Sequence, residues 1–90
     1  MSRWRDVALH SLRVACYRHA IGWSRHSRLV AVRASDLEHA ILAYVRTDSH
    51  HWAEVLEPEV LQVLPGTRSE LLHCDDEGVT VALWPPARGG

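Results

Sequence analysis

Hydrophobic residues recur at helical intervals over the first quarter of the chain and predict a helix over residues 3–22, ending at Gly22. One broad side of this helix is apolar and holds Trp4, Ala8, Leu12, Ala15, Cys16 and Trp23. A second apolar stripe, at heptad spacing, holds Val7, Val14 and Ile21. A helix that is apolar on two sides must bury both. Either the rest of the chain wraps this helix, or one side meets a second copy or a partner.

The two segments that follow this helix, residues 28–33 and 35–46, have patterns that differ from each other. The run RLVAVR, residues 28–33, is rich in β-branched residues and predicts a short strand. The run SDLE, residues 35–38, has the form of a capping box, in which a serine and a glutamate satisfy the first backbone amides of a helix. Apolar residues at positions 37, 40, 41, 44 and 45 follow at helical spacing. The pattern therefore predicts a second helix from residue 35 to about Arg46.

Residues 49–64 form an apolar helical pattern that a proline interrupts. In one straight helix Glu59 would fall within the apolar stripe, and Pro58 would end or kink the helix before it. We therefore predict two short helical pieces, 49–56 and 58–64, with the second starting at the proline. The valine-rich segment 59–64 is also compatible with a strand.

The last part of the chain alternates between apolar and polar residues on both sides of the turn DDEG, which predicts a β-hairpin over 70–74 and 79–84. The expected fold is α+β, with a long N-terminal helix, a short strand, two to three further helices and a C-terminal hairpin. This order of elements resembles that of winged-helix domains. We expect a single compact domain over residues 1–86 and a flexible tail over 87–90.

Charge is distributed unevenly along the sequence, although the net charge is −1. Residues 1–33 hold seven arginines and one acid, whereas residues 34–90 hold three arginines and ten acids. The two halves either neutralise each other within one fold or form separate basic and acidic surfaces that attract a partner. The chain has no apolar run long enough to span a membrane and no recognisable signal peptide, and its two cysteines do not form a disulfide framework. We expect a cytoplasmic protein.

The surfaces that a winged helix normally turns toward DNA carry the wrong charge here. The third helix and the hairpin tip are acidic through Glu54, Glu57, Glu59, Asp75, Asp76 and Glu77. Carboxylates facing phosphates oppose binding. A nucleic-acid-binding role would instead use the arginines of the first third, namely Arg5, Arg13, Arg18, Arg25 and Arg28.

Metal binding and catalysis have weak support in the sequence. Cys16 and His19 lie one helical turn apart and, with His73 and Cys74, would supply a zinc ligand set. However, neighbouring residues of a strand point to opposite faces, so His73 and Cys74 cannot easily bind one ion. The sequence contains none of the common catalytic or phosphate-binding motifs. We expect no cofactor, no metal and no enzymatic activity.

These observations favour a small non-enzymatic protein-interaction module, such as an adaptor, regulator or inhibitor. It would form a homodimer through the stripe Val7, Val14 and Ile21, and would present its acidic residues to a protein partner. The alternative is a winged-helix-like regulator that binds nucleic acid through its N-terminal arginines.

Overall fold

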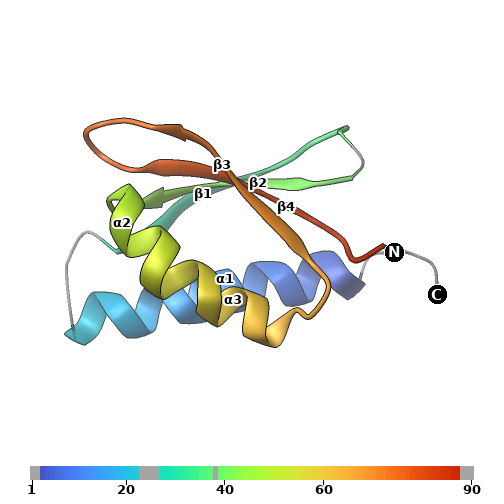
Figure 1. Cartoon of the computed structure of the whole chain (residues 1–90), viewed down its shortest axis with the longest axis horizontal. Coiled ribbons are helices and arrows are strands. Elements are labelled where there is room, and N and C mark those ends of the chain that lie inside the picture. Colours follow the sequence, from blue (N-terminus) through green and yellow to red (C-terminus); the bar gives the residue numbers. More distant parts are fainter. Residues whose placement is uncertain (1–2, 23–26, 38, 88–90) are drawn as a thin grey trace.

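A computed structural model describes residues 3–22, 27–37 and 39–87 of the chain. It has two layers, a four-stranded antiparallel sheet and a pair of helices that cover one face of it (Figure 1). The predicted α+β class is therefore confirmed. The elements in chain order are α1 (Arg3–Gly22), β1 (Arg28–Ala34), β2 (Ile41–Arg46), α2 (Ser49–His51), the π-helical turn η1 (Trp52–Leu56), α3 (Glu57–Val63), β3 (Arg68–Cys74) and β4 (Val79–Trp84).

The sheet is built from two hairpins that meet in its centre. Its strand order is β1-β2-β4-β3, so that β2 and β4 form the middle and β1 and β3 form the edges. The turns of the two hairpins lie at opposite ends of the sheet (Figure 1). The chain thus runs through a helix and a hairpin twice, and the predicted C-terminal hairpin is confirmed.

The core lies between the sheet and the helices. Alternate residues of the central strands point inward, and they are Ile41, Ala43, Val45, Val79, Val81 and Leu83. The helices cover them with Ala8, Leu12, Ala15, Cys16, Trp52, Leu56, Val60 and Leu64. Burial of these apolar side chains is the main source of stability. It also fixes which side of each helix faces away from the sheet.

The predicted helix from residue 35 to about Arg46 is wrong, because residues 41–46 form the central strand β2. Ser35 does not cap a helix. Its Oγ accepts the Leu37 N–H at 3.0 Å within the β1–β2 turn, and its own N–H donates to the Ala40 carbonyl at 3.0 Å. His39 has a φ of 62°, in the left-handed region, which interrupts any right-handed helix here. Pairing of β2 with both β1 and β4 then outweighs the helical spacing of its apolar residues.

Residues 49–63 form one continuous helical segment instead of the two separate pieces that the sequence predicts, and 59–63 is not a strand. Asp48 caps its start by accepting the His51 N–H at 2.7 Å. The segment passes Pro58 because the turn before the proline is π-helical, with the Glu57 N–H donating to the Trp52 carbonyl. The extra residue in this turn shifts the helical phase. Glu59 consequently leaves the apolar stripe and points toward α1.

Candidate partner-binding site

The two apolar sides of α1 have different environments. Ala8, Leu12 and Cys16 are buried against the sheet and the second helical segment, whereas Val7 and Val14 are 45% and 39% exposed. The side chain of Ile21, the third residue of the predicted stripe, lies outside the described part of the chain, as does Trp23. Within the described residues, the fold therefore covers one apolar side of α1 and leaves Val7 and Val14 at the surface.

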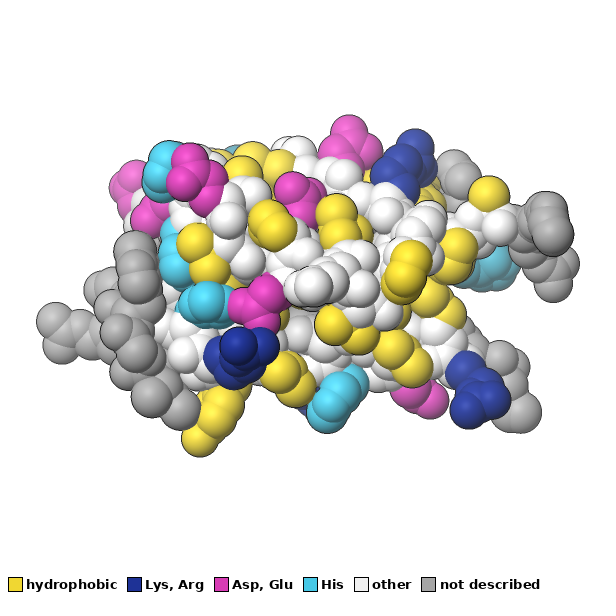
Figure 2. All heavy atoms as spheres, turned by 60° about the horizontal axis from the view of Figure 1, so that its bottom comes forward, with side chains coloured by type: hydrophobic (Ala, Val, Ile, Leu, Met, Phe, Trp, Pro, Cys, Tyr) yellow, Lys and Arg dark blue, Asp and Glu magenta, His cyan; other side chains and the backbone are white. Residues whose placement is uncertain are grey.

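A groove of about 200 Å³ runs between α1 and α3 and is lined by Val14. Its α1 wall comes from residues at helical spacing, and its α3 wall comes from Glu59 and Val63, one turn apart. Val63 is 60% exposed. The lining residues are His10, Ser11, Val14, Ala15, Arg18, Glu59 and Val63. Figure 2 shows hydrophobic side chains extending across the middle of this helical face, with basic, acidic and histidine side chains interspersed among them.

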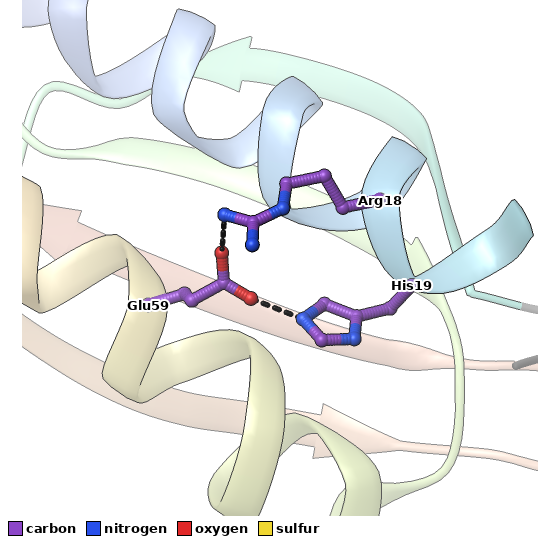
Figure 3. A network of polar contacts seen from close by, with 3 residues as sticks. All are labelled: Arg18, His19 and Glu59. Carbon is purple, nitrogen blue, oxygen red and sulfur yellow. Dashed lines mark hydrogen bonds and ion pairs between the residues drawn. The ribbon is translucent and has the colours of Figure 1, made fainter. Parts of the chain in front are cut away.

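The polar end of the groove is a network of three residues (Figure 3). Glu59 of α3 reaches across to α1, where one carboxylate oxygen accepts a hydrogen bond from Arg18 Nη1 at 2.7 Å. Its other oxygen accepts a hydrogen bond from His19 Nε2. Arg18 is 65% exposed at its side chain and Glu59 only 25%. The pair joins the basic first third of the chain to the acidic remainder, so the two charges neutralise each other within the fold.

His51 lies beneath this network and is 2% exposed. Its ring meets that of His19 edge to face, with the ring centroids 5.9 Å apart. Burial lowers the pKa of His51, and the neighbouring His19 lowers it further. A buried imidazole held neutral in this way packs as an uncharged ring and adds no positive charge to the groove.

Ser11 forms part of the groove floor and is 5% exposed. Its hydroxyl has no hydrogen-bond partner among the described residues. Buried hydroxyl groups are usually paired, since an unpaired one loses its hydration without compensation. The floor of the groove thus carries a polar atom between the apolar Val14 and Ala15.

The six acidic residues predicted as a partner surface do not form one group. Glu59 is engaged with α1, and Glu54 of η1 pairs with His50 at 3.2 Å. Glu57 is half-buried at the start of α3. Asp76 and Glu77 are exposed in the β3–β4 turn, where Asp75 accepts hydrogen bonds from the Glu77 and Gly78 amides and from the Tyr44 hydroxyl.

The five arginines predicted for nucleic acid are also divided among different surfaces. Arg18 is paired with Glu59, and Arg5 is half-buried and has contacts of its own. Arg13 is exposed beside a hollow that α1 forms with β1. Arg28 is exposed at the start of β1. Arg25 lies outside the described residues.

The four residues considered for zinc are not brought together. Cys16 faces the core, and burial raises the pKa of its thiol to about 12. Cys74 is exposed on the edge strand β3. The sheet register places His73 opposite Thr80 and Cys74 opposite Val79, so these neighbours point to different faces as expected. Across residues 3–22, 27–37 and 39–87, no group of three or more histidine, cysteine and acidic side chains could hold a metal ion.

Sequence reasoning missed the contribution of α3 to this site. Val63 and Glu59 belong to the predicted piece 58–64, but nothing in their spacing indicates that they face α1. The sequence did contain one indication, because Glu59 falls within the apolar stripe of the predicted helix. A carboxylate in that position indicates a specific partner elsewhere in the chain. Because the two helices come together only in the tertiary structure, the partner could not be identified from the sequence.

None of the described helices is long and apolar enough to cross a membrane. The sequence matches no protein-family model, and neither the curated proteins nor the solved structures contain a significant match. The site described above is therefore interpreted from its own geometry.

Proposed function

We propose that this protein is a small non-enzymatic interaction module that associates with a second copy of itself through the face formed by α1 and α3. Adaptors, regulators and inhibitors are built from modules of this kind. The observation that carries the proposal is the exposure of Val14 and Val63 on the two walls of a groove between the helices, with Val7 exposed two turns before Val14 on α1. Exposed hydrophobic groups that form a continuous area next to a groove are typical of interaction sites.

The charges of this face support a second copy as the partner. Arg18 and Glu59 neutralise each other within one chain, so the groove has no strong charge of either sign to select an oppositely charged protein. Two identical faces can approach without repulsion between unpaired charges. Val7, His10, Val14 and Tyr17 lie along α1 at heptad spacing. In an antiparallel pairing of two α1 helices, Val14 of each copy would pack beside His10 of the other and Val7 beside Tyr17.

Light scattering during gel filtration tests this proposal. We expect the wild-type chain to elute as a dimer at high micromolar concentration, and Val14→Glu and Val63→Glu to elute as monomers, because each places a charge in the apolar contact. Leu37→Glu is the matched control. Leu37 is 68% exposed in the β1–β2 turn, and its replacement should leave the dimer intact. A wild-type chain that remains a monomer, or a dimer unaffected by both groove variants, would contradict the proposal.

A further inference from the structure

The face of the sheet opposite to the helices has no covering layer in the described structure, and the strand register identifies its residues. Directly opposite residues of antiparallel strands share a face. The inward residues are those of the core, so the alternate residues point outward. These outward residues are Arg28, Ala31, Arg33, Leu42, Tyr44, Arg46, Arg68, Glu70, His73, Thr80, Ala82 and Trp84.

Arginine dominates the charge of the strands on this open face, and the acidic residues Asp75, Asp76 and Glu77 lie in the turn at its Tyr44 end. Its strands carry four arginines and one acid, Glu70. Arg28, Arg33 and Arg46 form no ion pair with any described carboxylate. Arg28 lies directly opposite Arg46, an arrangement of like charges that destabilises a sheet unless an anion lies nearby. The open face is therefore complementary to a ligand with several negative charges.

Aromatic side chains lie among these arginines. The guanidinium of Arg68 stacks over the ring of Trp84, with its Cζ 4.0 Å from the ring centroid. Tyr44 is fixed at the other end of the central strands. Its hydroxyl donates to Asp75 at 3.0 Å, and its ring packs so closely on Gly78 that an added Cβ there would lie 3.0 Å from it. Both rings thus have defined positions on the open face.

A hollow of about 240 Å³ lies beside Tyr44. Its walls are mostly apolar, with Ala31, Leu42 and Thr80 around the tyrosine, and Arg33 also lines it. A flat ring can enter such a hollow and stack on Tyr44, while the anionic group next to that ring meets Arg33 or Arg46. Alternation of flat apolar rings and negative charges is the chemical pattern of a nucleic-acid single strand.

We propose that the open face of the sheet binds single-stranded nucleic acid, with a base in the hollow beside Tyr44 and phosphates against Arg28, Arg33, Arg46 and Arg68. Bases in a duplex are stacked on one another and unavailable to a side chain, so a single strand is the favoured form. The acidic β3–β4 turn, with Asp76 and Glu77, lies at the same end of the face as Tyr44, Arg28 and Arg46, so it repels phosphate that extends beyond these arginines. This surface is separate from the groove between α1 and α3, so the two proposals stand independently.

Fluorescence anisotropy with a labelled single strand of about 12 nucleotides at about 50 mM salt tests the proposal. We expect Arg33→Glu and Arg46→Glu to weaken binding about tenfold each, because each reverses a charge that faces phosphate. Arg13→Glu is the matched control, since it makes the same change in net charge on α1 and should alter binding by no more than about twofold. Arg68→Glu on β3 repeats the test at another strand if either main variant fails to fold.

Two further measurements distinguish recognition of the bases from attraction to the phosphate charges alone. Tyr44→Leu is expected to weaken binding of the single strand about tenfold while leaving binding of inorganic polyphosphate unchanged. A matched duplex is expected to bind more weakly than the single strand. The proposal is overturned by any of three results, which are no binding by the wild type, equal losses in Arg13→Glu and Arg33→Glu, or polyphosphate binding as tight as that of the single strand. Binding that persists in the monomeric Val14→Glu variant shows that it does not depend on self-association.

Discussion

Charged side chains are paired across the groove of the helical face of this protein and unpaired, among the described residues, on its open sheet face. On the helical face, Arg18 is paired with Glu59 across the groove, and exposed valines dominate what remains. On the sheet face, Arg28, Arg33 and Arg46 have no described carboxylate partner, and a mostly apolar hollow lies beside Tyr44. Paired charges beside apolar side chains are suited to another protein surface, whereas unpaired arginines beside an aromatic ring are suited to an anion. One small core positions both faces.

A substitution in the core that both faces share is expected to have the largest effect. It should affect the helical face and the sheet face together. Leu12 is completely buried in α1, between the groove and the sheet. Leu12→Ala leaves a cavity and should lower the free energy of unfolding by about 3 kcal/mol. Urea denaturation followed by circular dichroism measures the loss. Self-association and single-strand binding should both weaken, and a change in only one of them would show that the faces are less dependent on the core than we infer.

A replacement in the β3–β4 turn is expected to disturb the sheet face alone. A Cβ added at Gly78 would lie 2.4 Å from the Val45 carbonyl oxygen and 3.0 Å from the Tyr44 ring. Gly78→Ala should therefore lower the free energy of unfolding by about 2 kcal/mol and displace the tyrosine. Gly66→Ala is the control, because its φ of 86° makes alanine unfavourable there as well, but it lies before β3 and away from Tyr44. Single-strand binding should fall in Gly78→Ala and remain in Gly66→Ala.

Lowering the pH is expected to remove stability that the same turn contributes. Hydrogen bonds from the Glu77 amide, the Tyr44 hydroxyl and the Gly78 amide lower the pKa of Asp75. The folded state therefore binds a proton at this carboxyl less readily than the unfolded chain does. The stability it contributes is present above the ordinary aspartate pKa of about 3.9 and is lost as the pH falls through the lowered value.

Asp75→Asn tests this acid effect. Its free energy of unfolding should change less between about pH 6 and about pH 2.5 than that of the wild type. Asp76→Asn is the control, since Asp76 is exposed in the same turn and no described hydrogen bond involves its side chain. Equal acid sensitivity in the wild type and Asp75→Asn would contradict the assigned hydrogen bonds.

The ion pair on the helical face is expected to give the smallest effect. Because Arg18 is mostly exposed, a double-mutant cycle of Arg18→Ala and Glu59→Ala should yield a coupling energy of about 0.5 kcal/mol in the unfolding free energy. The exposed pair His50 and Glu54 provides a reference, with an expected coupling of about 0.3 kcal/mol. A coupling of several kcal/mol would show that the Arg18–Glu59 pair determines the fold, instead of only neutralising the groove.

The elements that sequence reasoning predicted correctly are those whose pattern is determined locally. The period of α1 and the alternation around the DDEG turn hold over many residues, and both elements lie where they were expected. In β2, residues 41–45 are all apolar or aromatic, so they fit a helix and a buried strand equally well. Only pairing with β1 and β4 decides between the two, and that pairing is tertiary.

For the candidate site too, the sequence predicted the features that depend on a local pattern and not those that depend on tertiary packing. The two-sided pattern of α1 identified Val7 and Val14, which the structure leaves exposed. The partner of Glu59 and the unpaired arginines of the sheet face depended on the packing of α3 against α1 and on strand register. The prediction that residues 35–46 form a helix also placed Arg46 off the sheet, which concealed its position opposite Arg28.

Paramagnetic relaxation between two differently labelled populations tests the central claim, which is self-association through the α1 and α3 face. One population carries a nitroxide on Gln62→Cys in a Cys74→Ser background, next to Val63. Cys16 should not take the label, because burial raises the pKa of its thiol to about 12. The other population is the ¹⁵N-labelled wild type, so any broadening arises between copies. We expect the strongest broadening at the α1 amides around Val7 and Val14 and weaker broadening at the amides of the sheet. Broadening confined to the sheet, or absent at high micromolar concentration, would contradict the claim.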